Sequence, residues 1–579
     1  MYMDIKRTLH VAVQGALAGI GATEAVFFVG YPPVGIAGDY SVSASAAYSA
    51  GKILGKSPQE TAELICTELD RAVIPQVERV EVAGGCFINI FLSPEYFAGV
   101  VSRARVDGEK WGSNAILEGK RVLLEKSAPN LFKPFHVGHL LNISVGESLS
   151  RLMRFSGAEV IDIAYPSDIS LGVAKAVWAI IESGLENELS VGVLGECYVL
   201  GTRKYDEDES AKKTIIEINK KLNARTAGKE WDIYQRGVAL NLEYFKNITE
   251  RLGSDFAGYV FESESGVVGK EIVEQHVPNI FTVSDGAIIF EGEKYGLHTR
   301  VFVTSLGLPV YEAKDLGLLK LKFDKYNPDI SVVITDVEQK QYFEVIKKAA
   351  GLVDEKWSEK SVYWQHGRMR FEGGSISSRY GNVPLAEDLI EKVKDAVEQK
   401  INTVLRATHA NAHDDAQLEA IAISALRYAF LRSGSGHNIV FDFDKSLSFD
   451  GDSGPYLEYA HARCCSILRK GKEAGILSAP SPNMGEGWGD VHAVSNASSL
   501  LRILSRFPSA VERAVCEYEP HFVTQYLTEL AGAFNAWYAN TRVLDGTDEA
   551  PYKLAVVDAV RQTLLNGLWL LGCRAQEEM

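Results

Sequence analysis

The chain has 579 residues, more than a single hydrophobic core accommodates, so about three or four domains are expected. Apolar residues make up 46% and charged residues 23%, which is typical of soluble globular proteins, and no run of about 18 apolar residues predicts a membrane span. The net charge of −16 counts against a nucleic-acid partner, because phosphate binding requires positive charge. A large acidic protein can still have a basic face.

The first 30 residues loosely imitate a signal peptide, with Lys6 and Arg7 ahead of an apolar stretch. Polar residues interrupt that stretch at His10, Gln14 and Glu24. Since Leu9, Val13 and Leu17 fit one face of a helix, we expect a helix and no export. The seven cysteines form no C-x-x-C pair, so no structural zinc is expected, and their odd number fits reduced thiols in the cytoplasm.

Residues 1 to about 115 have the pattern of an α+β domain. Ser57 and Glu60 form a capping box, with Pro58 at the first helical position, and predict a helix over residues 60–73. Residues 80–82 and 87–91 read as two strands joined by a glycine pair. The segment 51–57 resembles a P-loop, but only three residues separate its glycines where four are required, so the helix cap is the better interpretation.

From Arg121 the pattern changes to β-α-β. Residues 122–124 predict a short strand, residues 127–135 a loop, residues 137–155 a helix and residues 160–164 the next strand. Ligands bind at the carboxyl end of such strands in open parallel sheets. Residues 185–290 are more charged and less regular, which indicates an insertion. Residues 330–334 predict another buried strand, and from about residue 384 the pattern is helical.

The most informative motif is His136-Val-Gly138-His139, at the start of the predicted helix. With 12 histidines and 51 glycines, chance produces this pattern about 0.02 times in a chain of 579 residues. The two imidazoles lie on one helical face, the glycine lets a flat ligand approach, and the helix N-terminus offers N–H groups to phosphate. Such a site can hold ATP and stabilise charge on its α-phosphate. The alternative is that both histidines only cap or pack the helix start.

The surrounding residues give the motif a family context. The stretch 127–142 fits P-N-x-x-K-P-x-H-x-G-H, which resembles the HIGH signature of class I aminoacyl-tRNA synthetases and, within that class, of the arginyl enzymes. Further stretches are similar to that family, in the same order: Y-x-T-R-D-L at 311–316, Q-x-x-H-F at 339–343 with Tyr342 in place of histidine, the KMSKS loop at 375–379, and the DALR domain at 425–427 and 454–463. Residues 38–40 and 85–89 resemble its N-terminal tRNA-binding domain.

The resemblance implies an α/β multidomain fold in which a Rossmann-like parallel-sheet catalytic domain lies between an N-terminal α+β domain and a C-terminal all-α helical bundle. The expected boundaries are 1–115 for tRNA binding, 116–395 for catalysis and 396–579 for anticodon binding. It also implies an arginyl-tRNA synthetase activity: ATP-dependent activation of arginine to arginyl-adenylate, then transfer to the 3′ end of tRNA(Arg). Mg²⁺ would accompany ATP, and the protein would act as a cytoplasmic monomer.

The arginine pocket implied by the family follows the chemistry of the guanidinium group, which needs a planar carboxylate partner. Asp315 and Tyr311 are assigned to it, and they share a helical face because they are four residues apart. Glu125 and Asn130 would hold the amino and carboxylate groups of the substrate, and Gln339 would complete the pocket. Taken singly, each acid is more often a solvated surface carboxylate.

On the nucleotide side, His136 and His139 would bind phosphate and stabilise the transition state. The further ATP-binding residues implied by the family are Lys133, Gly138, Ser377 and Ser378. The chain departs from the family in the KMSKS loop, where Ser375 and Ser378 replace both lysines. Our hypothesis is that Lys133, helped by Arg379, neutralises the departing pyrophosphate. The alternative for Lys133 is a solvated loop lysine.

For tRNA, Phe87 and Asn89 match an aromatic-x-Asn pair that contacts a D-loop base in the family, and stacking with an amide hydrogen bond suits an unstacked base. The alternative is a strand with Phe87 in the core. Tyr456 and Tyr459 either face the anticodon loop or belong to the core. Asp168 matches the family, but its neighbours do not, which leaves the adjoining pocket wall undefined.

Three rival interpretations fit parts of the sequence. A small cytidylyltransferase also uses H-x-G-H, but the helical C-terminal third and the KMSKS-like loop disfavour it. Methionyl and cysteinyl synthetases usually have zinc ligands, which are absent here. A non-catalytic synthetase-like protein that binds tRNA or senses arginine is favoured only by the degenerate KMSKS loop.

Overall fold

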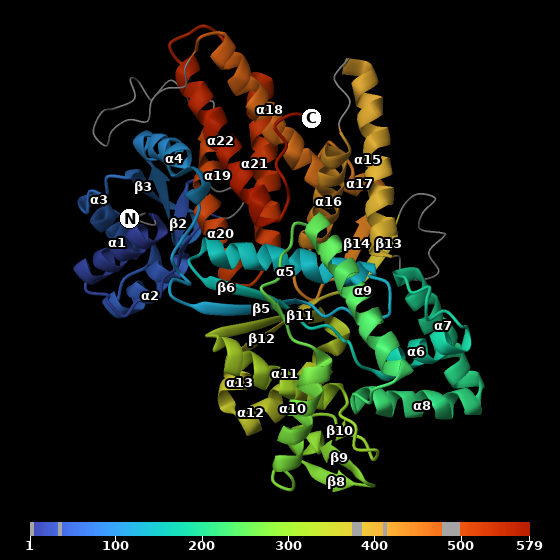
Figure 1. The fold of residues 1–579 in the computed structure, drawn as a ribbon. Helices are drawn as coiled ribbons and strands as arrows, with labels where there is room; N and C mark the ends of the chain where they lie inside the picture. The colour runs from blue at the N-terminus through green and yellow to red at the C-terminus, as the bar shows by residue number, and fades with distance from the viewer. Residues whose placement is uncertain (1–4, 33–36, 373–384, 409–413, 477–497) are drawn as a thin grey trace. The chain divides into compact units, whose positions relative to one another are not determined.

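A computed structural model describes residues 5–32, 37–372, 385–408, 414–476 and 498–579 (Figure 1). Spatial contacts group the chain into two compact units. The first contains residues 1–111, 464–507 and 532–563, and the second contains residues 112–463, 508–531 and 564–579. The three consecutive domains expected from sequence stay a prediction.

The first unit contains a four-stranded antiparallel sheet in the order β1-β2-β4-β3. Its N-terminal elements are α1 (Ile5–Gly19), β1 (Val29–Gly30), β2 (Tyr40–Val42), α2 (Ala44–Leu54), α3 (Pro58–Arg71), β3 (Val77–Ala83), η1 (Gly84–Cys86), β4 (Phe87–Leu92), α4 (Pro94–Asp107) and η2 (Gly108–Lys110). The expected capping box is confirmed, since Ser57 N donates to Glu60 over 3.0 Å and Glu60 N donates to Ser57 Oγ over 3.3 Å. The apolar face of α1 is also confirmed, because Leu9, Val13 and Leu17 are buried.

The second unit is built on a five-stranded, all-parallel sheet in the order β12-β11-β5-β6-β7. The strands are β5 (Arg121–Ser127), β6 (Glu159–Ala164), β7 (Gly258–Tyr259), β11 (Ile330–Asp336) and β12 (Ser361–His366). Helix α5 (Val137–Phe155) covers one face, and α11 (Tyr311–Tyr326), α12 (Lys340–Val353) and α13 (Glu355–Glu359) lie on the other (Figure 1). The predicted β-α-β unit and the predicted strand at 330–334 are therefore confirmed.

Close packing of α5 on β5 fixes where the H-x-G-H motif lies. At Gly146 an added Cβ would approach the Cβ of Lys126 to 2.1 Å, so only glycine lets the helix lie this near the strand. Helix α5 begins at Val137, directly after the loop that leaves β5. The motif is thereby held at the carboxyl edge of the parallel sheet, where ligands are expected.

The segment predicted as a less regular insertion is mostly helical, which corrects that expectation. Its elements are α7 (Val191–Glu207), α8 (Glu209–Asn223), α9 (Lys229–Arg251), β7, α10 (Glu262–Gln275), β8 (Thr282–Ser284) and β9 (Ala287–Phe290). Helices α7 to α9 share a buried core with α6 (Leu171–Glu182). Strand β7 pairs with β6, so the chain returns to the central sheet before α10 begins. The many charges mark the solvated faces of amphipathic helices.

Helices α10 and α11 cross with almost no space between their backbones. A Cβ at Gly269 would lie 1.7 Å from Ala313 O, and one at Gly317 would lie 1.9 Å from Ser265 O. Two glycines that face each other allow this approach. The crossing sets the start of α10 beside the face of α11 that presents Asp315.

The remaining elements are η3 (Gly292–Tyr295), β10 (Arg300–Val303), η4 (Val337–Gln339), β13 (Met369–Glu372), α15 (Ala386–Thr408), α16 (Asp415–Leu431), β14 (Ile439–Asp442), α17 (Phe443–Ser446), α18 (Gly454–Glu473), α19 (Ser498–Ser505), α20 (Phe507–Cys516), α21 (His521–Asn540) and α22 (Ala550–Leu570). Within the described ranges, the C-terminal region is helical as predicted, apart from β14, which forms a parallel pair with β13. Helices α15 and α16 pack against α5. None of the helices in the described ranges combines the length and apolar character that crossing a membrane requires.

Candidate active site

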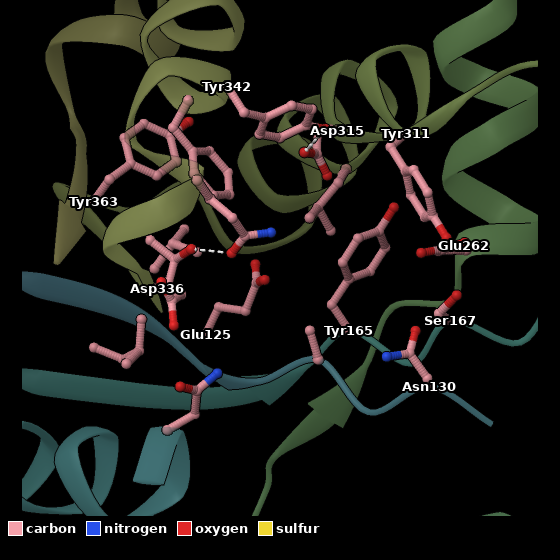
Figure 2. Close-up of a pocket in the computed structure, with 18 of the residues that line it drawn as sticks. Glu125, Asn130, Tyr165, Ser167, Glu262, Tyr311, Asp315, Asp336, Tyr342 and Tyr363 are labelled. Atoms are coloured by element: carbon pink, nitrogen blue, oxygen red, sulfur yellow. Dashed lines mark hydrogen bonds between the residues drawn. The ribbon is translucent and has the colours of Figure 1, made fainter. Parts of the chain in front are cut away.

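A cavity of about 640 Å³ opens at the carboxyl edge of the central sheet. Figure 2 shows Glu125 reaching into it from β5 and Tyr165 from the end of β6, towards Asp315 and Tyr342 on the opposite wall. Tyr311 and Glu262 close one side, and Tyr363 lies on another (Figure 2). The cavity therefore collects side chains that lie more than 200 residues apart in sequence, between Glu125 and Tyr363.

The H-x-G-H histidines line this cavity at the start of α5. The two rings are stacked, with centroids 3.9 Å apart. His136 Nδ1 accepts from Gly138 N over 3.1 Å, and His139 Nδ1 accepts from His136 N over 3.2 Å. The alternative capping role is thus real, and it corrects one expectation: these two backbone N–H groups are occupied by imidazoles and do not face a ligand. A Cβ at position 138 would meet the His136 ring at 2.9 Å, so Gly138 makes room for that ring.

The same hydrogen bonds define what the imidazoles can do. Burial, with Lys133 nearby, lowers the pKa of His136 to about 4, and burial lowers the pKa of His139 well below its usual value. Both rings are therefore neutral near pH 7. Because each Nδ1 accepts a hydrogen bond, the proton lies on Nε2, which leaves one N–H donor per ring. Neutral N–H donors suit phosphate oxygens.

Lys133 lies in the loop ahead of α5, is exposed, and has its ammonium 5.9 Å from the ring centroid of Tyr198 on α7. Its charge contributes to the lowered pKa values of both histidines. The two histidines line the cavity, whereas Lys133 is not among the residues that line it. Ser377, Ser378 and Arg379, the remaining candidates, fall outside the described residues.

Most acidic side chains around the cavity are matched by a cation. Glu125 pairs with Lys322, Glu262 with Lys314 over 2.6 Å, and Glu312 with Arg300 over 3.2 Å. At the rim, Glu338 pairs with Arg368. Helix α11 supplies two of these four cations, Lys314 and Lys322, and it also contains Asp315.

Asp315 differs from these acids. Within the described cavity lining, it and Asp336 are the carboxylates with no lysine or arginine at ion-pair distance. Asp336 is at the rim, where 35% of its side chain is exposed and its Oδ1 accepts from Glu338 N over 2.8 Å. Asp315 instead accepts from the Tyr342 hydroxyl over 2.5 Å. Burial, opposed by that hydrogen bond, raises the pKa of Asp315 to about 7, with Glu125 and Glu262 adding to the rise.

The other predicted arginine-binding residues also line this cavity. Tyr311 is at its mouth and is 55% exposed. Asn130 forms a bridge with Ser167, next to Glu262 (Figure 2). Gln339 precedes α12 and accepts from Thr335 Oγ1. The structure therefore gathers all five predicted residues around one cavity.

The residues predicted to contact tRNA are in various settings. Asn89 is buried in β4, where its Oδ1 accepts from Ser41 Oγ over 3.0 Å and its Nδ2 donates to Ala37 O over 2.6 Å. Phe87, at the start of β4, is half-buried. Tyr456 and Tyr459 are half-buried on α18, with the Arg463 guanidinium 4.7 Å from the ring centroid of Tyr459. Their contacts with tRNA stay predictions.

Sequence reasoning missed several lining residues: Tyr165, Glu262, Arg300, Lys322 and Tyr363. It also missed Lys314, which pairs with Glu262. One of them had a readable signal. Lys322 is seven residues after Asp315, two turns along the same helical face. Glu262 follows the short strand β7, but a two-residue strand is too weak a pattern to identify from sequence. Asp168, beside the pocket wall that the sequence left undefined, accepts from Tyr234 over 2.8 Å and from Ser263 N over 2.9 Å, and so fixes the start of α10.

Comparison with known families identifies the architecture. Residues 100–443 match the catalytic domain of the class I tRNA synthetases for arginine, residues 4–92 the arginyl-tRNA synthetase N-terminal domain, and residues 457–579 the DALR anticodon binding domain. The arginine–tRNA ligase of Clostridium perfringens is 30% identical over 560 residues, 95% of each chain. The chain belongs to the arginyl-tRNA synthetase family.

Further relatives agree over the whole length of the synthetase. The arginine–tRNA ligase of Halothermothrix orenii is 27% identical, with 100% of both chains covered. The fold matches the Thermus thermophilus arginyl-tRNA synthetase with a TM-score of 0.77, 24% identity and 100% coverage of both chains. The Plasmodium falciparum structure matches with a TM-score of 0.77, 18% identity and 99% coverage of both chains. The predicted family, fold class and enzyme class are confirmed.

Proposed function

We propose that this synthetase activates arginine with ATP and transfers it to the 3′ end of tRNA(Arg). In the first step, a carboxylate oxygen of arginine bonds to the α-phosphorus, the bond to the bridging oxygen breaks, and pyrophosphate leaves. In the second, a hydroxyl of the terminal ribose attacks the activated carbonyl, and AMP leaves. Both steps depend on positioning and charge stabilisation more than on proton transfer.

The observation that supports arginine as substrate is the charge pattern of the cavity. Glu125, Glu262 and Glu312 already have cationic partners, whereas the carboxylate of Asp315 has only a hydroxyl. A half-buried carboxylate that faces a cavity without a cation favours a ligand that supplies one. A guanidinium offers a planar set of donors for this carboxylate, and Tyr311, one helical turn away, would flank it.

The substrate's α-amino and carboxylate groups would lie towards the sheet, near Glu125, Asn130 and Gln339. This orientation places the reacting carboxylate on the side of the cavity where α5 begins. There the Nε2–H donors of His136 and His139 would meet the α-phosphate and its developing charge. Lys133 would neutralise the departing pyrophosphate, in the role that the missing KMSKS lysines leave open.

Mg²⁺ bound to the phosphates of ATP would neutralise part of their charge. The groups on this side of the cavity are imidazole N–H donors and an ammonium, which suit phosphate oxygens directly. The metal would therefore be held by the nucleotide. The N-terminal and DALR domains would bind tRNA, with Phe87, Asn89, Tyr456 and Tyr459 as the candidate contacts, and size-exclusion chromatography with light scattering would test the expected monomer.

Aminoacylation tests the proposal directly, with purified protein, ATP, Mg²⁺, labelled arginine and total tRNA. We expect arginine-specific charging that falls by about 10²- to 10³-fold in His139→Ala, because one stabilising donor is lost. His437→Ala, which removes an exposed histidine, is the matched control and should charge normally. A wild-type protein that binds tRNA but charges nothing would instead support the non-catalytic alternative.

A further inference from the structure

The hydroxyl of Tyr342 donates a hydrogen bond to Asp315 inside the cavity. Tyr342 is on α12 and Asp315 is on α11, and the distance from the hydroxyl to Asp315 Oδ2 is 2.5 Å. Sequence alone marked position 342 only as a departure from Q-x-x-H-F. The structure puts that departure in direct contact with the acid assigned to the guanidinium.

The ring of Tyr342 is fixed from two other sides. The Arg300 guanidinium lies 5.4 Å from its ring centroid, and the ring of Phe343 meets it edge-on at 5.0 Å. Arg300 is itself held by Glu312. Burial and the nearby Asp315 raise the pKa of the Tyr342 hydroxyl well above its usual value, so the hydroxyl keeps its proton and acts as a donor.

We infer that Tyr342 is a specificity-determining positioning residue, whose hydroxyl holds Asp315 in the ionised form that accepts a guanidinium and rejects a neutral side chain of the same shape. This inference rests on the proposed function, because it assumes that arginine occupies the cavity. Tyr342 acts through Asp315, and the inference assigns it no contact with the reacting atoms.

The physical reason lies in the donor and acceptor properties of a carboxyl group. An ionised carboxylate only accepts hydrogen bonds, which matches the donors of a guanidinium. A protonated carboxyl group also donates, so it can bind the ureido oxygen of citrulline, the neutral isostere of arginine. Whatever keeps Asp315 ionised therefore selects arginine over citrulline.

Asp315 needs this support because its surroundings favour the protonated form. The charged and titratable groups facing the pair are Tyr165, Glu125, Glu262, Arg300, Tyr311, Glu312, Lys322 and Tyr363. Burial is the largest cause of the raised pKa of Asp315, and Glu125 and Glu262 raise it further. The Tyr342 hydrogen bond and the charge of Lys322 lower it. Since Lys322 is already paired with Glu125, Tyr342 is the partner that belongs to Asp315 alone among these groups.

The test is Tyr342→Phe, which keeps the ring and removes the hydroxyl. Arginine and citrulline binding would be measured by calorimetry between about pH 6 and pH 8.5, together with KM and kcat for aminoacylation. Loss of a hydrogen bond to a charged group should shift the titration of Asp315 upward by about one unit. We expect arginine to bind about tenfold more weakly near pH 6, with the deficit nearly gone at pH 8.5. The preference for arginine over citrulline should fall most at the acidic end.

Two further variants separate positioning from structural damage. Tyr342→His retains an N–H donor at this position and should recover part of the preference for arginine. Tyr428→Phe removes a similar tyrosine–aspartate hydrogen bond, to Asp452 in the helical region, and should leave arginine binding normal at every pH.

A deficit in Tyr342→Phe that is absent, or equal at all pH values, would overturn the inference while leaving the proposed function intact. Wild-type protein that neither binds nor charges arginine would overturn the proposed function and this inference with it.

Discussion

Two clusters of charged side chains flank strand β5, and they differ in whether each acid has a cationic partner. In the first cluster, Glu147 on α5 is 2.7 Å from Lys126 on β5 and 2.7 Å from Arg151, and Ser254 donates to it over 2.8 Å. In the cavity, Asp315 has no such cation. The two cations, with Arg427 near them, outweigh burial and lower the pKa of Glu147 to about 2, whereas burial raises that of Asp315 to about 7.

The difference separates a structural carboxylate from one prepared for a ligand. Glu147 is buried, whereas Asp315 is half-buried and lines the cavity. Glu147 is matched on both oxygens within the chain and does not line the cavity, so its pairing stabilises the local packing of α5 on β5. Asp315 faces the cavity without a cation, and an acid with a perturbed pKa in a cavity is typical of a binding site.

The largest expected effect comes from Asp315→Asn. Removing the charge that meets the guanidinium should lower kcat/KM for arginine by about 10²- to 10³-fold, because the guanidinium is left without its carboxylate partner. KM for ATP and the thermal midpoint should change little, since Asp315 has no cation within the chain to strand. Steady-state aminoacylation and a thermal melt would check this. Charging within threefold of wild type would contradict the role of Asp315.

Glu147→Gln should lower the stability of the protein, in contrast to Asp315→Asn, which should lower kcat/KM. It takes the carboxylate partner from Arg151 and the nearer of two carboxylates from buried Lys126, which keeps Asp162 at 3.3 Å. We expect a loss of about 3 kcal/mol in the free energy of unfolding. The double change Lys126→Met with Glu147→Leu should cost less than Glu147→Gln alone, because the buried lysine is removed together with its nearer carboxylate and Asp162 keeps Arg154 at 2.7 Å. Denaturant titration measures both. The control is Lys220→Ala, which breaks an exposed pair with Glu217 and should cost less than about 0.5 kcal/mol. Equal losses for Glu147 and Lys220 would break the comparison.

The smallest expected effect is the pH dependence of arginine binding and of stability. The pKa shifts of Asp315 and Glu147 have opposite signs, so the two acids affect stability in opposite directions. The pKa of Asp315 is raised to about 7. Arginine binding should therefore weaken about tenfold for each unit below pH 7 and release a proton there, which calorimetry in two buffers detects. For the free protein, the stability linked to this group is present below its ordinary value of 3.8 and is lost as pH rises through about 7.

Glu147 behaves in the reverse sense. Its pKa is lowered from 4.5 to about 2, so its contribution to stability is present above pH 4.5 and is lost as pH falls through about 2.

Arginine affinity that stays constant from about pH 5.5 to pH 8 would show that Asp315 is not the acid that meets arginine.

Local patterns predicted a large part of the fold. The helix expected at residues 137–155 has those bounds in the structure, and the helix expected at 60–73 begins and ends two residues earlier, at Pro58–Arg71. Both have strong local signals, a capping residue and an apolar face. Strand β14 was missed because four residues in a helical context are too few to show a period of two. Residues 191–251 were misjudged because charge on solvated helix faces resembles irregularity.

The candidate site was predictable from the sequence where its residues lie close together along one helix. The histidines of H-x-G-H and the pair Tyr311 and Asp315 have close spacings on a helix, so sequence alone places each pair on one face. Which backbone groups remain available to phosphate was not predictable, because the imidazoles turn back on their own helix.

What the sequence determined by itself is the inventory of groups at the carboxyl edge of a parallel sheet, together with the family that uses them. The tertiary structure alone decided which acid lacks a cation. Glu262 and Lys314 pair across 52 residues, and Glu125 and Lys322 pair across 197. No local pattern encodes such pairings, because they arise when β5, α10 and α11 meet. Whether a carboxylate is charged depends on the groups within a few ångströms of it. For Asp315, only the fold decides which groups those are.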